Sequence, residues 1–264
     1  MSLVFSAIVP HPPLLLPSIG REHAKLLGKT WIAYQQVSAS LAASGAESIV
    51  VITPHFAFVP GTFLLNYSPT YKTNFKEFGD FSKPREYEPD HLLIEKIQRN
   101  SRKEKHPLIL LSEEHMDYGG GVPLYFLPHH NLKTKIVIIA PSDADIKSQF
   151  AFGKIIKDAI LQSRHKIAVI CSADLSHRHS SDSPSGFSKQ AKIFDEMMVA
   201  NLSAGNASPI LQMDDALVSE AHACGYKPIC LFLGIMDKIS CSPELLSYEV
   251  PFGVGYATLE FRLN

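Results

Sequence analysis

The sequence predicts an α/β fold: a single domain with a central, mostly parallel sheet and helices on both faces. Short runs of apolar, β-branched residues alternate along the chain with longer stretches of helical periodicity, as in a doubly wound sheet. The 264 residues, 45% of them apolar, suffice for one large core. Neither a linker nor a repeat divides the chain, so we expect one domain over residues 1–264. The runs typical of buried strands cover residues 3–9, 48–53, 135–140 and 167–172.

The segments between these runs predict the rest of the fold in order. The first long helical stretch ends before Gly45, where a glycine stop belongs. Residues 60–89 form an irregular, aromatic-rich excursion, and residues 117–123 are rich in turn-forming glycine. An apolar run covers residues 108–111, and a last strand is expected over 254–261. Helices are expected over residues 21–43, 89–100, 145–162, 189–202, 207–213 and 217–236.

Composition excludes several functional classes. The 25 Lys and Arg residues balance 26 Asp and Glu residues without a basic stripe, so we expect no nucleic-acid partner. The amino terminus lacks the pattern of a signal peptide, and no apolar stretch is long enough to span a bilayer, so we expect no membrane partner. The four cysteines form no C-x-x-C pair and suggest free thiols in a reducing compartment. We therefore expect a cytoplasmic protein.

Histidines stand at the ends of three predicted strands. Two runs stop at a Pro-His pair, at His11 and at His55, and the run over 167–172 leads through Asp174 to His177. The carboxyl ends of parallel strands meet at one sheet edge, where open α/β folds bind ligands. Histidine is the commonest metal ligand and the usual acid or base near neutral pH. The pattern predicts a metal-dependent active site, in which His177 is either a third ligand or a base.

A third ligand is needed beside His11 and His55, and Glu220 is the best carboxylate candidate. Its alternative role is that of an exposed helix glutamate. Asp174, Asp214 and Asp215 are rival carboxylates. Cys224 would suit a soft metal, although a small buried residue is the commoner role for a cysteine.

Six segments carry a family resemblance: residues 7–14, 52–55, 122–126, 172–178, 224–225 and 246–256. They resemble the LigB-type class III extradiol dioxygenase superfamily and, more closely, the LigB/Memo-like proteins of the AmmeMemoRadiSam group. The resemblance implies a LigB-like domain with a non-haem Fe(II) site at His11, His55 and Glu220, and Zn²⁺ as an alternative metal in purified protein. It implies His177 as the acid/base, and the candidate catalytic residues are His177, Tyr118 and Asp174.

The first functional hypothesis is ring cleavage of a small catechol or aminophenol with dioxygen. One position departs from the group's pattern, because Tyr118 stands where relatives carry histidine in an Asp-His-Gly segment. A phenol, with an ordinary pKa of about 10, is a poorer proton carrier near neutrality than imidazole. Tyr118 therefore motivates a second hypothesis: a Memo-like metal-binding protein without dioxygenase turnover, working with an AMMECR1-like or radical-enzyme partner or as a homo-oligomer. A zinc hydrolase is a weaker third hypothesis.

Overall fold

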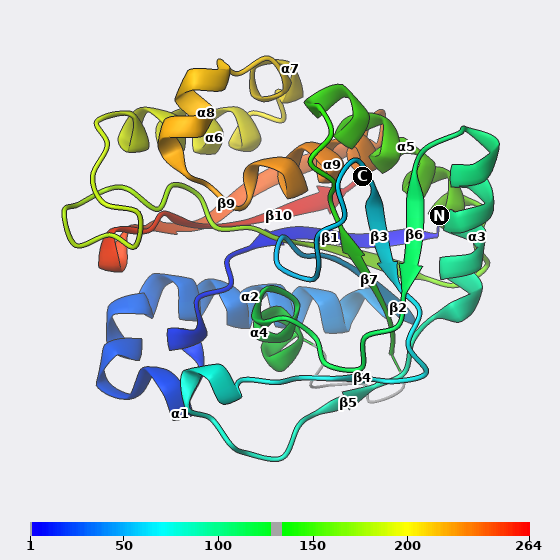
Figure 1. The fold of residues 1–264 in the computed structure, drawn as a ribbon, viewed down its shortest axis with the longest axis horizontal. Helices are drawn as coiled ribbons and strands as arrows, with labels where there is room; N and C mark the ends of the chain where they lie inside the picture. The colour runs from blue at the N-terminus through cyan, green and yellow to red at the C-terminus, as the bar shows by residue number, and fades with distance from the viewer. Residues whose placement is uncertain (1, 128–133) are drawn as a thin grey trace.

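The computed structural model describes residues 2–127 and 134–264, and its centre is an eight-stranded sheet (Figure 1). The strand order is β6-β3-β7-β2-β8-β1-β10-β9. The four central strands run parallel, because β2 pairs in parallel with both β7 and β8, and β8 pairs in parallel with β1. The predicted α/β fold and its four buried strands are confirmed. The central strands are β1 (Leu3–Val9), β2 (Ser48–Ile52), β7 (Lys135–Ala140) and β8 (Ile167–Ser172).

The outer strands are partly antiparallel. β3 (Phe63–Asn66) pairs antiparallel with β7 and parallel with β6 (Leu108–Leu111). At the other end, β10 (Tyr256–Leu263) pairs antiparallel with β1 and with β9 (Cys241–Glu249). The sequence predicts one closing strand but not β9, whose mixed polar residues suit a half-exposed edge better than a buried strand. A small ribbon of β4 (Tyr71–Lys72) and β5 (Glu86–Tyr87) lies within the aromatic-rich excursion.

Helices cover both faces of the sheet, as predicted. The strand β2 is buried throughout, and its residues alternate between two hydrophobic cores: Ile49 faces one core and Val50 the other. The helices α2 (Gly28–Ser44) and α4 (Tyr118–Phe126) contribute to the first core. The second core is formed with α3 (His91–Lys103), α5 (Ile146–Leu161), α6 (Gln190–Ser203) and α9 (Tyr226–Met236). The remaining helices are η1 (Pro13–Leu15), α1 (Pro17–Gly20), η2 (Arg21–Leu27), η3 (Lys76–Phe78), α7 (Ala207–Leu211), α8 (Asp215–Ala221) and η4 (Pro251–Gly253).

Two expected segments differ in ways that affect the site. The predicted helix over 217–236 is two helices, α8 and α9, because His222 adopts a left-handed backbone with φ of 49°. The glycine-rich segment from 117 is not a set of turns but the start of α4. Its N-cap is Asp117, whose carboxylate accepts a hydrogen bond from the Gly120 N–H. In the described part of the chain, no helix is both long and apolar enough to cross a membrane.

Candidate metal centre

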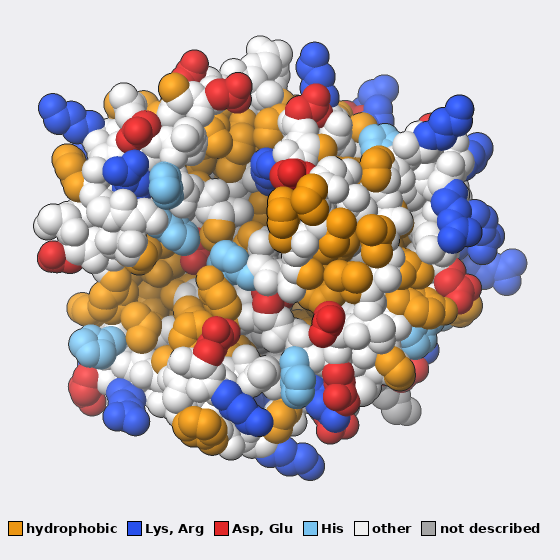
Figure 2. All heavy atoms as spheres, in the orientation of Figure 1, with side chains coloured by type: hydrophobic (Ala, Val, Ile, Leu, Met, Phe, Trp, Pro, Cys, Tyr) orange, Lys and Arg blue, Asp and Glu red, His pale blue; other side chains and the backbone are white. Residues whose placement is uncertain are grey.

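The central parallel strands bring the predicted histidines together. His11 follows β1 and His55 follows β2, and their ring centroids lie 5.1 Å apart. The segment after β8 lies between these strands in the sheet and carries Asp174. Figure 2 shows a hollow on this face, between the part of the molecule with α1 and α2 and the part with α6 and α8, with several histidine side chains along it. This is the sheet edge at which the strand ends predict a site.

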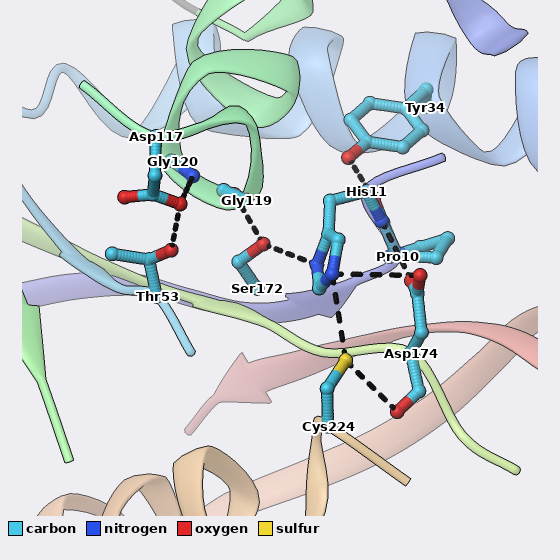
Figure 3. A network of polar contacts seen from close by, with 10 residues as sticks. All are labelled: Pro10, His11, Tyr34, Thr53, Asp117, Gly119, Gly120, Ser172, Asp174 and Cys224. Atoms are coloured by element: carbon cyan, nitrogen blue, oxygen red, sulfur yellow. Dashed lines mark hydrogen bonds and ion pairs between the residues drawn. The ribbon is translucent and has the colours of Figure 1, made fainter. Parts of the chain in front are cut away.

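Hydrogen bonds fix the orientation of the His11 ring (Figure 3). The hydroxyl of Ser172, at the end of β8, donates its only proton to the carbonyl of Gly119 at 2.5 Å. It must therefore accept the 2.8 Å hydrogen bond from His11 Nδ1. The His11 N–H of the backbone also donates to Asp174 Oδ1 at 2.8 Å. With Nδ1 protonated, His11 Nε2 carries the lone pair of the neutral ring and is the atom available to a metal.

Electron-pair donors converge on His11 Nε2. Cys224 Sγ lies 3.5 Å from it and Asp174 Oδ2 lies 3.4 Å from it. The ligand atoms of His11, His55 and Cys224 all lie within 4.8 Å of one another, and so do those of Asp174, His177 and Cys224. Cys224 belongs to both sets, so the two form one continuous group of donors.

Burial disfavours the charged form of each member of this group. Desolvation, followed by the neighbouring His55 and His177, holds the pKa of His11 well below its ordinary value. The pKa of His55 falls to about 4, mainly through burial and then through His177. Burial raises the pKa of Asp174 to about 7, against the opposing effect of the His11 backbone N–H. Burial also raises the pKa of the Cys224 thiol well above its usual value.

The donor set fits a transition-metal ion. The Nε2 atoms of His55 and His177 are buried and have no hydrogen-bond partner, an arrangement that costs free energy unless another ligand satisfies them. Iron, copper and zinc bind neutral imidazole nitrogens and thiol sulfur, whereas magnesium and calcium prefer oxygen ligands. A bound metal ion would also lower the pKa of the Cys224 thiol, so that the sulfur would bind as a thiolate.

Glu220 is not among the residues brought together here, and its role as the third ligand stays a prediction. Its side chain is 53% exposed and forms an ion pair with Arg178 Nη1 at 3.1 Å. The Ser188 hydroxyl donates to the same carboxylate at 3.0 Å. Glu220 stands in the last turn of α8, and the left-handed residue His222 redirects the chain beyond it. Glu220 is therefore placed as an exposed glutamate near the end of a helix.

Cys224 lies beside both strand-end histidines. It lies in the short connection between α8 and α9, which is tied to the strand ends by the Gly225 N–H donating to the Asp174 carbonyl at 2.9 Å. A Cβ atom on Gly225 would lie 2.5 Å from that carbonyl oxygen, so only glycine allows this approach. From the sequence, Cys224 is a possible ligand for a soft metal, but a small buried residue is the commoner role.

Tyr118 covers the outer side of the histidine pair. As the first residue of α4, it stacks on His55 with centroids 4.6 Å apart and planes 21° apart, and it meets His11 edge-on at 5.7 Å. Phe78, in η3, packs edge-on against Tyr118 at 5.3 Å. Burial raises the pKa of Tyr118 above its ordinary value, followed by the effects of Cys224 and Asp174. The phenol therefore keeps its proton near neutrality and can donate a hydrogen bond.

His177 is held by its backbone beside the donor group. Its N–H donates to the Ala221 carbonyl at 3.1 Å, which joins the segment after β8 to the end of α8. The fully buried carboxylate of Asp195 supports the same segment by accepting the Ser176 N–H at 2.9 Å and His179 Nε2 at 2.7 Å. Burial lowers the pKa of His177, while Asp195 opposes that shift. A neutral imidazole is thus present as a proton acceptor.

The family assignment follows from a profile match over most of the chain. Residues 6–259 match the family of the catalytic LigB subunit of aromatic ring-opening dioxygenase. The chain belongs to the LigB family. The resemblance inferred from its motifs is confirmed at the level of the family.

Two further likenesses agree with this assignment. Protein CA_C1420 of Clostridium acetobutylicum is 28% identical over 271 residues, a stretch that covers 99% of this LigB-family chain and 58% of the relative. The chain therefore spans little more than half the length of that relative. A crystal structure of the uncharacterised protein JW3007 from Escherichia coli K12 has the same fold, with a TM-score of 0.68 at 15% identity over 97% of this chain and 99% of that one.

Proposed function

We propose that this LigB-family protein binds a redox-active metal ion through His11, His55 and Cys224 and opens the ring of a small aromatic diol or aminophenol with dioxygen. The observation that supports it is the group of neutral donors with two orphaned imidazole nitrogens, one at a ligand position and one on His177. Iron(II) is the metal that this chemistry calls for, and zinc is the alternative expected after purification in air.

Each residue has a defined part in this proposal. The metal would polarise and orient the substrate oxygens and dioxygen. His177 accepts a proton from a substrate hydroxyl, since burial keeps its ring neutral near pH 7. Tyr118 donates a hydrogen bond from a phenol that does not ionise there. The rings of Tyr118 and Phe78, which meet edge-on, give an aromatic substrate apolar surface to pack against.

Asp174 serves as a positioning carboxylate. It accepts the backbone N–H of His11 and lies within 3.4 Å of His11 Nε2, so its charge depends on what occupies the site. Burial raises its pKa to about 7, and a nearby cation would favour its ionised form. We infer that Asp174 neutralises part of the metal charge, either directly or through a bound solvent molecule.

The test is oxygen uptake by anaerobically prepared protein loaded with iron(II), over a panel of catechols and aminophenols. We expect uptake with formation of a ring-opened product that contains both oxygen atoms. His177→Ala should keep the bound iron and lose turnover, whereas Glu220→Gln should keep both. Iron-loaded protein that consumes no oxygen with any member of the panel would contradict the proposal.

A second function is favoured by Cys224 and Tyr118. A half-buried thiol beside two imidazoles suits copper(I) as well as iron, and the phenol is a weaker proton carrier than imidazole. The protein would then hold a metal ion without turnover and act with a partner, such as an AMMECR1-like or radical-enzyme protein. Copper(I) binding much tighter than iron(II) binding, together with no oxygen uptake in either state, would favour this function over ring opening.

A further inference from the structure

A separate pocket lies between α2 and the C-terminal end of α4. It has a volume of about 450 Å³, within the range of roughly 300–1,000 Å³ typical of small-molecule sites. One face of α2 supplies Trp31, Gln35 and Ala39 at helical spacing, and α4 supplies Phe126. Neither helix contributes a metal-ligand candidate to this pocket, so it is not part of the donor group at the strand ends.

The walls of the pocket are aromatic. Trp31 meets Phe126 edge-on with centroids 5.4 Å apart, and Tyr34 packs against the same ring at 5.3 Å. Trp31 remains 38% exposed, so a large apolar ring is left facing solvent at the pocket. An aromatic or similarly flat apolar group entering here would remove that surface from water.

The charge at the pocket is positive. Arg85 lines it with its guanidinium carbon 3.8 Å from the centroid of the Tyr125 ring, and Arg85 Nη1 donates to the Tyr125 carbonyl at 2.5 Å. None of the described residues that line the pocket is acidic. A guanidinium keeps its charge at all ordinary pH values and pairs with planar carboxylates. The pocket therefore complements an anion attached to an aromatic group.

Tyr34 separates this pocket from the metal centre. Its ring lines the pocket, while its hydroxyl donates to the carbonyl of Pro10, the residue before His11 (Figure 3). Tyr34 is only 2% exposed, so it fills the space between the two sites. A molecule in the pocket would touch one side of Tyr34 without reaching the donor group.

We propose that this pocket binds a small aromatic carboxylate, with the ring against Trp31 and Phe126 and the carboxylate towards Arg85. This site is additional to the proposed ring-opening reaction and does not depend on it. Trp31 is the only tryptophan in the chain, so its fluorescence reports on the pocket directly.

The experiment titrates 3-phenylpropanoate and its neutral counterpart 3-phenylpropan-1-ol into the full-length protein while Trp31 fluorescence is recorded. We expect a saturable change with both probes and roughly tenfold tighter binding of the acid, since a charge-assisted hydrogen bond adds to the ring contact. Binding should persist in metal-loaded protein and in the presence of catechol. Displacement of the acid by catechol would show a single shared site and overturn the proposal.

Variants locate the binding. Ala39→Phe places a ring inside the pocket and should abolish binding of both probes. Ala42→Phe makes the same change at an exposed position of α2 that does not line the pocket, and should leave binding unchanged. Arg85→Met should remove the preference for the acid, whereas Arg85→Lys should retain part of it. Three results would each overturn the proposal: titrations that do not saturate, equal affinity for the acid and the alcohol, or equal loss of binding in Ala39→Phe and Ala42→Phe.

Discussion

The strand ends and the α8–α9 connection supply the same candidate site by different routes. His11 and His55 are placed by the parallel register of β1, β8 and β2, which a fold of this class cannot change without losing its core. Cys224 is placed by a short connection that depends on one left-handed residue and one close glycine contact. Sheet topology therefore fixes the histidines, whereas local backbone geometry selects the third donor.

The largest expected effect tests the strand-end side of this comparison. His55→Ala removes a proposed ligand whose Nε2 is buried without a partner. Metal affinity should fall by more than about 100-fold, which is the upper end of what loss of an outer-shell partner costs. Equilibrium metal binding under anaerobic conditions measures it, and circular dichroism checks that the fold remains. Normal metal binding by this variant would show that the ligand set is wrong.

Cys224→Ser tests the other side. The hydroxyl is a harder and weaker donor than a thiolate, so affinity for copper(I) or iron(II) should fall by about 100-fold, with a smaller loss for metals that prefer oxygen. The sulfur-to-metal charge-transfer absorption of a cobalt-substituted sample should disappear. If the absorption survives in the serine variant, the sulfur is not a ligand and the site is held by the histidines and Asp174.

Ser172→Ala tests the control of the His11 tautomer. The Ser172 hydroxyl bridges His11 Nδ1 and the Gly119 carbonyl by hydrogen bonds. Without it, the proton of the neutral His11 ring can reside on either nitrogen. We expect metal affinity to fall between about tenfold and 100-fold. Ser172→Thr keeps the hydroxyl and serves as the matched comparison. An unchanged affinity in the alanine variant would mean that the bridging hydroxyl does not prepare the ligand.

The pH dependence of stability tests the buried, neutral character of the site. Between pH 6.5 and about 4 the unfolded chain binds a proton at His55 that the folded chain does not. The free energy of unfolding of metal-free protein should therefore fall as the pH drops through this range, by up to about 1.4 kcal/mol per pH unit for this residue. His177 shifts in the same direction.

The pair of His11 and Asp174 contributes little to the dependence of the free energy of unfolding on pH. In the folded protein the proton resides on Asp174, whose pKa is raised, and in the unfolded chain it resides on His11, whose pKa is ordinary. Urea denaturation between pH 4.5 and pH 8 measures the slope, and His55→Gln should reduce it. Stability that rises on acidification would contradict the assignment of neutral histidines.

Glu220→Gln should have the smallest effect. The carboxylate is half exposed and its ion pair with Arg178 lies at the surface, where such pairs contribute about 0–1 kcal/mol. We expect unchanged metal affinity and a loss of at most about 1 kcal/mol in the free energy of unfolding. A large loss of metal affinity would restore Glu220 as a ligand and displace Cys224.

The sequence predicts the strand-end histidines because a parallel sheet leaves few alternatives for where its carboxyl ends lie. It does not predict that Cys224, rather than Glu220, lies beside these histidines. Glu220 and Cys224 are four residues apart, so an unbroken helix over 217–236 would place both on one face. The break at His222 separates them, and no proline or glycine precedes it to mark that break.

The start of α4 also differs from the turns that its sequence predicts. A run of three glycines after Tyr118 is typical of turns, yet these residues are helical because the Asp117 carboxylate caps them. Tight packing explains the glycines, since a Cβ on Gly119 would lie 2.6 Å from Thr53 Oγ1 and 3.2 Å from the His55 ring. The helix N-cap and the histidine contact are tertiary features that composition does not reveal.

Two properties of the α8–α9 connection belong to different residues: its attachment to the strand ends and the side chain that it offers to the site. The anchor of the α8–α9 connection is residue 225, while the side chain offered to the site belongs to residue 224. Exchange of residue 224 for histidine, aspartate or methionine would therefore change the donor atom without moving its attachment point. Under the proposed ligand set, residue 224 is a replaceable donor at a fixed backbone position, and a series of such exchanges would give one scaffold a graded set of metal preferences.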